Sequence, residues 1–296
     1  MTRLWDSAVG LLLCTGGLLG LTPLFGKMAA QGGVPAPAWA FAVSFGAAAV
    51  LLGALLARGG AVLLSPHRLR YFVVTAAVSY ALPNLLMFSA IPHLGAGYAG
   101  IMYTLSPLFT LGLSILAGLR RPSRLGVLGI AVGFVGAVMV ALTRGEAGQP
   151  AEPLWVLLAL LIPVCLAAGN VYRTLDWPKT AGPVELAVGS HGAAAVMLLV
   201  GMLVLGEGGT VGRLAEVPVL VLAQAVVGAA MFALFFRLQA VGGPVYLSQI
   251  GYVGAAVGLL AGVLALGERY EPLTWAGAAI IAVGVVLTTR AESGAR

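Results

Sequence analysis

The residues that could perform acid–base, metal or nucleophilic chemistry lie far apart along this chain. The three histidines, His67, His93 and His191, fall in separate segments, and Asp176 has no acidic neighbour. An enzyme embedded in a membrane would need clustered carboxylates, a set of metal ligands, or a nucleophile beside a base. The two cysteines lie within apolar stretches and indicate neither a disulfide framework nor a metal cluster. The sequence therefore predicts a protein that is not an enzyme and that holds no cofactor or metal.

A second group of residues suits binding rather than catalysis. These are Tyr, Asn and Gln residues inside long apolar stretches, where a polar group is costly unless it is paired or faces a wet cavity. Tyr80 and Asn84 are four residues apart and share one face of a helix. Their phenol and amide could hold the polar end of an amino acid while a substrate ring stacks on an aromatic side chain. The alternative is an interhelical hydrogen bond that serves packing alone.

Two further stretches carry tyrosines. Tyr98 and Tyr103 lie about 140° apart around a helix, so one of them is expected to face a neighbouring helix. Pro107 predicts a kink in the same stretch, because proline cannot donate the helical hydrogen bond. The stretch at residues 243 to 266 predicts a polar stripe along a cavity. Tyr246, the first residue of this stripe, could equally anchor at the membrane interface. This stripe consists of Tyr246, Gln249 and either Tyr252 or Val253.

Asn170 and His191 complete the set of predicted substrate-binding residues. Asn170 could line a cavity together with Thr22, with which it aligns in the repeat described below, or it could bond the local backbone. His191 could relay protons or contact a carboxylate, or it could remain neutral and bond a neighbouring helix. The apolar stretches contain no buried Asp, which favours facilitated diffusion or exchange over tight ion coupling.

The elements that position these residues are membrane-spanning helices. Of the 296 residues, 60% are hydrophobic and 9% are charged, against about 25% charged in soluble domains. Apolar stretches of about 20 residues, the length that crosses a bilayer, recur throughout. The basic residues sit singly or in short clusters between these stretches, so the predicted partner is the lipid bilayer and not nucleic acid. Spans are predicted near residues 7 to 29, 36 to 57, 69 to 91, 94 to 118, 123 to 144, 153 to 173, 182 to 206, 215 to 239, 243 to 266 and 271 to 290.

The basic residues also predict the orientation. If the N-terminus is cytoplasmic, cytoplasmic segments hold twelve of the sixteen basic residues, Arg173 among them, as the positive-inside rule requires. Both termini are therefore expected in the cytoplasm.

The chain also contains an internal repeat. An ungapped offset of 148 residues aligns Gly95 with Gly243 and Tyr98 with Tyr246, among many further matches. The two halves, residues 1–148 and 149–296, would each contain five spans. An odd number of spans makes the second half enter from the opposite side, so the repeats are predicted to be inverted. Inverted repeats are typical of secondary transporters, which bind substrate between the halves and rock one half against the other.

Glycines predict one close helix contact. Gly126, Gly129, Gly133 and Gly136 follow one face of the fifth span, and small residues let membrane helices approach closely. We interpret this face as a seam inside the molecule rather than between protomers.

Several short motifs accompany the two repeats of five spans. They are Pro107, the corner Gly267–Arg269, Trp275, Gly277 and Gly284. Together these features resemble the drug/metabolite transporter superfamily, whose members carry paired EamA-type domains. The resemblance covers the whole chain, but the first half has Arg120 where the second has Glu268, which argues against an essential chemical role for that glutamate. Within the superfamily, the tyrosine-bearing fourth and ninth spans are most similar to YddG-type exporters.

The resemblance implies a ten-helix, all-α fold around a central cavity and export of aromatic amino acids across the bacterial inner membrane. A proton-coupled exporter of other metabolites is the first alternative, and a membrane-embedded lipid-modifying enzyme is the second. The sequence also leaves open a channel, the substrate range, the direction of transport and the oligomeric state, with which a monomer is compatible.

Overall fold

The computed structural model describes residues 7–96, 102–119, 123–142, 153–267 and 269–293. This part of the chain forms helices and contains no strand. Helices suit a bilayer because they satisfy every backbone polar group within one segment. Six helical segments are long and apolar enough to cross a membrane: Ala8–Gln31, Ala36–Leu56, Pro66–Leu94, Pro153–Leu175, Pro183–Val204 and Pro218–Ser248. Shorter apolar helices cover Met102–Leu116, Arg124–Gly136, Ile250–Leu266 and Pro272–Thr288.

Within its described residues, the first half of the chain contains five helical segments, three of which consist of more than one helix. They are α2 (Ala8–Leu19) with α3 (Leu21–Gln31), α4 (Ala36–Leu56), α5 (Pro66–Thr75) with the π-helix η1 (Ala76–Ala81) and α6 (Leu82–Leu94), the 3-10 helix η2 (Met102–Leu105) with α8 (Ser106–Leu116), and α9 (Arg124–Leu142).

The second half repeats this order with longer helices. They are α10 (Pro153–Leu175), α11 (Pro183–Val204), the 3-10 helix η3 (Gly208–Glu216), α12 (Pro218–Ser248), α13 (Ile250–Leu266) and α14 (Pro272–Ser293).

The predicted spans coincide with these helices at most boundaries. The span predicted at 36 to 57 is α4, and that predicted at 153 to 173 is α10. The third span is longer than predicted and runs from Pro66 to Leu94. Its start is set by Ser65, whose hydroxyl accepts a hydrogen bond from the Arg68 backbone N–H, with proline at the first helical position.

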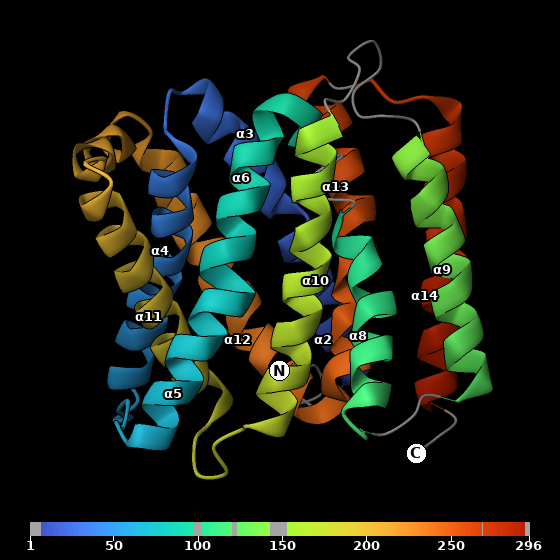
Figure 1. Ribbon diagram of the computed structural model, residues 1–296, viewed down its shortest axis with the longest axis horizontal. Coiled ribbons are helices and arrows are strands. Elements are labelled where there is room, and N and C mark those ends of the chain that lie inside the picture. Colours follow the sequence, from blue (N-terminus) through green and yellow to red (C-terminus); the bar gives the residue numbers. More distant parts are fainter. Residues whose placement is uncertain (1–6, 97–101, 120–122, 143–152, 268, 294–296) are drawn as a thin grey trace.

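The helices stand side by side along the long axis of the molecule (Figure 1). The α4 and α11 helices pack together at one end, and α9 and α14 pack together at the other. Between them, α6, α10 and α8 lie at the front of the view, with α2, α12 and α13 behind. Large apolar side chains such as Leu157, Val196 and Leu264 are exposed on the outer surface, where a bilayer would cover them.

Two glycines break the helices at equivalent places in the two halves. Gly95 follows α6 with φ of 82°, and Gly243 interrupts α12 with φ of 72°. A side chain is strained at such positive φ values, so glycine is required at both. The two positions are aligned by the 148-residue offset of the sequence repeat. Gly95 therefore ends α6, and Gly243 divides α12 into two parts.

The glycine seam lies inside the molecule, as predicted. A Cβ on Gly129 would stand 2.8 Å from the Gly284 carbonyl oxygen, and one on Gly136 would stand 2.5 Å from the Gly277 carbonyl oxygen. The α9 and α14 helices therefore touch backbone to backbone. Gly133 additionally accommodates the ring of Tyr252.

The structure corrects the predicted kink at Pro107. Pro107 lies in the first turn of α8, directly after η2. At that position the missing N–H has no intrahelical partner to lose. Pro107 therefore lies where the 3-10 helix η2 gives way to α8, and not in the interior of a continuous α-helix.

Candidate functional site: a cavity between the two halves

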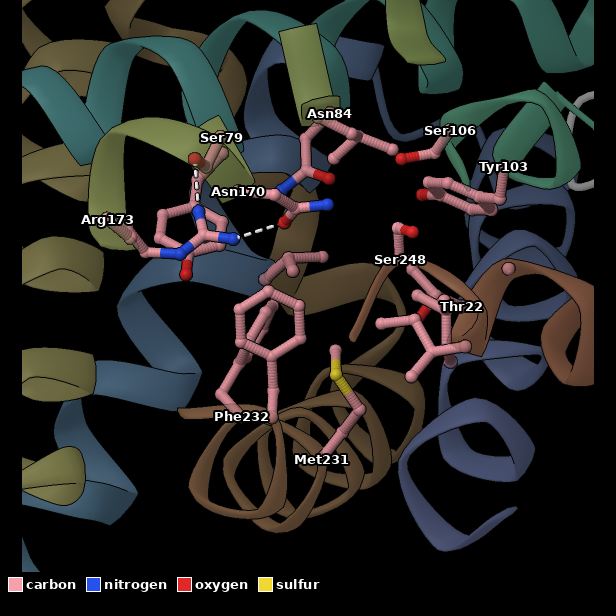
Figure 2. Close-up of a pocket in the computed structure, with 17 residues that line it drawn as sticks. Thr22, Ser79, Asn84, Tyr103, Ser106, Asn170, Arg173, Met231, Phe232 and Ser248 are labelled. Atoms are coloured by element: carbon pink, nitrogen blue, oxygen red, sulfur yellow. Dashed lines mark hydrogen bonds between the residues drawn. The ribbon is translucent and has the colours of Figure 1, made fainter. Parts of the chain in front are cut away.

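A cavity lies between the front and back helices. In Figure 2, polar side chains such as Ser79, Asn84 and Ser106 lie toward the top of the cavity, and Met231 and Phe232 lie toward the bottom. The lining residues are Leu19, Thr22, Val43, Ser79, Tyr80, Asn84, Tyr103, Ser106, Leu166, Asn170, Arg173, Met231, Phe232, Phe235, Ser248, Ile250 and Gly251.

The π-helix η1 brings Ser79, Tyr80 and Asn84 to the same wall. Pro83 has no N–H for the helical hydrogen bond, and the wider turn of η1 directly precedes it. Such single-turn π segments are frequent at functional sites. The Tyr80 hydroxyl and the Asn84 Nδ2 are both buried and have no hydrogen-bond partner among the described residues. Other buried polar atoms also lack a partner in the described structure, but these two belong to residues that line the cavity, where a ligand could pair with them.

Arg173 is a charged residue that the sequence predicts in a cytoplasmic segment and that the structure places at the wall of the cavity. It lies in the last turn of α10 and is 1% exposed. Its Nη2 donates to Asn170 Oδ1 at 2.5 Å, its Nη1 donates to Ser79 Oγ, and its Nε donates to Gln239 Oε1 at 3.3 Å. The guanidinium carbon also lies 4.8 Å from the centre of the Phe235 ring.

Asn170 joins this arginine to a neighbouring helix. Its Nδ2 donates to Thr110 Oγ1 on α8 at 3.3 Å, while its Oδ1 accepts from Arg173. Its backbone carbonyl accepts from Gln239 Nε2 at 3.1 Å. The side chain that lines the cavity is therefore fixed by α8, α10 and α12 together.

Aromatic rings form another part of the wall. The Tyr80 and Phe232 rings meet edge to face at 5.3 Å. His191 lies behind them, fully buried, with ring centres 4.0 Å from Tyr80 and 3.8 Å from Phe232. Tyr103, on the far side, donates from its hydroxyl to Met87 Sδ at 2.7 Å.

Four of the nine predicted binding residues line the cavity: Tyr80, Asn84, Tyr103 and Asn170. His191 contacts the wall from behind, and Tyr246 is buried near the end of α12 without being a lining residue. Tyr98 lies outside the described residues.

Gln249 and Tyr252 point away from the cavity. Gln249 accepts a hydrogen bond from Thr288 on α14, and the Tyr252 hydroxyl donates to the Ile130 carbonyl on α9 at 3.5 Å. The predicted stripe assumes one continuous helix, but α12 ends at Ser248 and α13 starts at Ile250, which changes the face that meets the cavity. The lining residues of this stretch are Ser248, Ile250 and Gly251.

The repeat offset relates several lining residues to one another. Thr22 aligns with Asn170, Asn84 with Phe232, and Tyr103 with Gly251, and all six line the cavity. Gly251 also permits a close approach, since a Cβ there would overlap the Tyr103 backbone. Each half therefore contributes equivalent positions to one shared cavity.

Ion pairs join the halves at the end of the molecule where α5 begins. Buried Arg68 pairs with Glu185 of α11 and also donates to Thr180 Oγ1 at 3.0 Å. Asp176, directly after α10, accepts from Arg70 Nη2 at 2.6 Å. Partial burial raises the pKa of the Asp176 carboxyl, but hydrogen bonds from Tyr172, Arg70 and His67 outweigh it and hold this pKa below its usual value.

Comparison with known proteins decides the family. The model of the EamA-like transporter family matches the chain twice, at residues 6–142 and 153–290. The chain belongs to this family. As an EamA-like transporter it is a multi-pass membrane protein with two EamA repeats, and the cavity is shared by both repeats.

One solved structure, described as the crystal structure of a protein, shares the fold of this EamA-like transporter. It is 22% identical, covers 96% of this chain and 98% of its own, and superposes with a TM-score of 0.69. No curated protein matches the EamA-like transporter in sequence.

Proposed function

We propose that this EamA-like transporter exports aromatic amino acids and similar small metabolites across the bacterial inner membrane through the cavity. The observation that supports this most strongly is the composition of the cavity wall. Aromatic rings of Tyr80 and Phe232 lie beside the unpaired amide of Asn84. A substrate with an apolar ring and a polar end would use both kinds of surface.

The proposed architecture is ten transmembrane helices in two inverted repeats, residues 1–148 and 149–296. The six long apolar segments would be joined by the four shorter apolar helices as further spans. Both termini would lie in the cytoplasm. The matched breaks at Gly95 and Gly243 support two equivalent halves.

Alternating access is the proposed mechanism. The pairs Arg68 with Glu185 and Arg70 with Asp176 each join one half to the other at the same end of the cavity. By the predicted orientation this is the cytoplasmic end. Breaking these contacts while the halves rock would open the cavity to the cytoplasm.

We further propose facilitated diffusion or exchange rather than proton coupling. None of the described lining residues is Asp or Glu, and buried Glu185 already pairs with Arg68. Proton-coupled export is the second candidate, because both ring nitrogens of buried His191 are without a hydrogen-bond partner in the described structure.

Reconstituted liposomes test the proposal. We expect saturable uptake of labelled tryptophan, phenylalanine and tyrosine, and little uptake of alanine, lysine or a nucleotide sugar. Tyr80→Ala and Asn84→Ala should each lower the initial rate roughly threefold to tenfold, as expected for one lost ring contact or hydrogen bond. Phe45→Ala, which removes an exposed aromatic ring from α4, is the matched control and should leave the rate unchanged.

Two outcomes would contradict parts of this proposal. Absence of flux for every aromatic amino acid would overturn the substrate assignment. Uptake that requires a pH gradient and is lost in His191→Gln would replace facilitated diffusion by proton coupling.

A further inference from the structure

Arg173 is a buried positive charge that lacks a negative partner among the residues the structure describes. Its hydrogen bonds go to the neutral side chains of Ser79, Asn170 and Gln239. The nearby carboxylate of Asp176 is instead bonded to Arg70 and Tyr172. A buried charge is costly unless it is paired, and a charge inside a membrane protein typically marks a substrate pathway. A substrate could supply the missing negative charge.

The guanidinium also has donors left for a ligand. It carries five N–H groups in a planar fork. The three hydrogen bonds use one N–H on each nitrogen, so within the described part of the chain one N–H on Nη1 and one on Nη2 have no partner. A guanidinium typically binds both oxygens of a carboxylate through such paired donors.

The surroundings of Arg173 suit an anion attached to an aromatic ring. Figure 2 shows Arg173 and Ser79 together at one side of the cavity, with Phe232 at the adjacent wall. The unpaired Asn84 Nδ2 is a further donor at the same cavity. A carboxylate bound at Arg173 would therefore leave the rest of an aromatic substrate against apolar and aromatic side chains.

An ammonium group finds no comparable partner. The described lining residues include no carboxylate, so an ammonium would meet neutral oxygen atoms and aromatic ring faces, which do not neutralise its charge as a carboxylate does. It would also be repelled by the positive charge of Arg173 at the short distances of this cavity.

We propose that Arg173 binds the carboxylate of the substrate and that the ammonium group is not required, so the transported class includes aromatic carboxylic acids without an amino group. This inference rests on the proposed function, because it takes the cavity as the substrate site. Arg173 is then the group that distinguishes anionic substrates from aromatic amines.

Three indole compounds that differ only in their charged groups test this on the unaltered protein. Tryptophan carries both groups, indole-3-propionate lacks the ammonium, and tryptamine lacks the carboxylate. Isothermal titration calorimetry in detergent should show binding of tryptophan and indole-3-propionate. Tryptamine should bind roughly 10-fold to 100-fold more weakly, the loss expected when one hydrogen bond to a charged group is removed.

Arg173 variants then assign the effect to this residue. Arg173→Gln should weaken indole-3-propionate binding by the same factor and leave tryptamine binding unchanged or stronger. Arg173→Lys should be intermediate, because it keeps the charge but loses the fork. Arg58→Gln, which removes an exposed guanidinium outside the cavity, should bind all three compounds as the unaltered protein does.

The outcomes separate the carboxylate assignment from the proposed transport of aromatic compounds. Equal binding of tryptamine and tryptophan, or undiminished binding of indole-3-propionate by Arg173→Gln, would overturn the carboxylate assignment and leave the aromatic transporter standing. Binding of none of the three compounds would overturn both. If Arg173→Gln does not fold, the three-compound series on the unaltered protein still gives the answer.

Discussion

Gly169 determines how closely Ser79 can approach Arg173. A Cβ at this position would overlap the Ser79 hydroxyl and stand 3.2 Å from Arg173 Nη1. Glycine is unfavourable inside a helix by about 1 kcal/mol relative to alanine. Its presence in α10 is therefore explained by the contact between the two halves rather than by helix stability.

Gly169→Ala should weaken ligand binding without weakening the helix. The new methyl group would force the Ser79 hydroxyl away from Arg173, so the guanidinium would lose one of its three supports. We expect the Kd for tryptophan to rise about tenfold, as for one hydrogen bond to a charged group. Titration calorimetry measures this, and Gly17→Ala, whose Cβ would meet no atom within 4 Å, is the control. An unchanged Kd would show that Ser79 does not position Arg173.

Sequence reasoning could find the uncharged part of the cavity but not its charge. Asn84 and Asn170 stand out because an amide in an apolar stretch needs a partner or a cavity, and the structure places both at the cavity wall. Arg173 did not stand out, because an arginine near the end of an apolar run is ordinarily an interfacial orientation signal. Only the extension of α10 to Leu175 and the approach of η1 place Arg173 inside the molecule, at the cavity wall.

At the scale of helices, the buried pair of Arg68 and Glu185 fixes α5 against α11. Glu185 also accepts from the Leu63 backbone N–H at 3.0 Å, so one carboxylate holds both the start of α5 and the segment before it. A buried ion pair adds little net stability compared with an apolar pair, but the loss of one partner leaves an uncompensated charge.

Glu185→Gln should therefore destabilise the protein by about 3–5 kcal/mol in SDS-induced unfolding from mixed micelles. The double variant Arg68→Met with Glu185→Leu should recover most of this loss. Arg213→Gln, which breaks an exposed pair with Glu216, should cost about 0–1 kcal/mol. A Glu185→Gln loss no larger than that of the exposed pair would show that water reaches the buried pair.

Asp176 predicts a second, pH-dependent contribution to the stability of the protein, at the same end of the molecule as the pair of Arg68 and Glu185. Its pKa is lowered in the folded protein from 3.8, so the folded state favours the charged carboxylate. The stability this contributes is present above the unfolded pKa and is lost as the pH falls below about 4 through the folded pKa. Thermal unfolding measured from pH 7 to pH 3 should show this decline, and Asp176→Asn should remove that part of it. A parallel decline in the variant would assign the pH dependence to other groups.

Helix boundaries were predictable where a single physical signal decides them. Hydropathy placed α4 and α10 almost to the residue, because the change from apolar to polar is abrupt there. The π turn of η1 and the helix start at Pro107 carry no comparable signal. Their geometry depends on neighbouring helices, and so does the face that Gln249 and Tyr252 present.

At the scale of the whole molecule, the two EamA repeats do not simply lie next to each other. Arg173 of the second half is supported by Ser79 of the first, and Asn170 of the second donates to Thr110 of the first. The cavity is thus a property of both halves together, which is why neither half of the sequence alone indicates it.

The glycine seam between α9 and α14 has a consequence for assembly. These are the last helices of the two repeats, and they pack backbone to backbone. Two fragments produced by cutting the chain within residues 143–152 should recognise each other when co-expressed and should purify as one complex through an affinity tag on either fragment.

The seam can be tested within these fragments. Gly284→Leu in the second fragment should reduce co-purification, because its side chain would meet the Gly129 carbonyl. Gly201→Leu, at a position with nothing within 4 Å of a Cβ, should not. Reassembly of the fragments would mean that the covalent link between the halves is dispensable and that a transporter of this kind could have arisen from two separate chains.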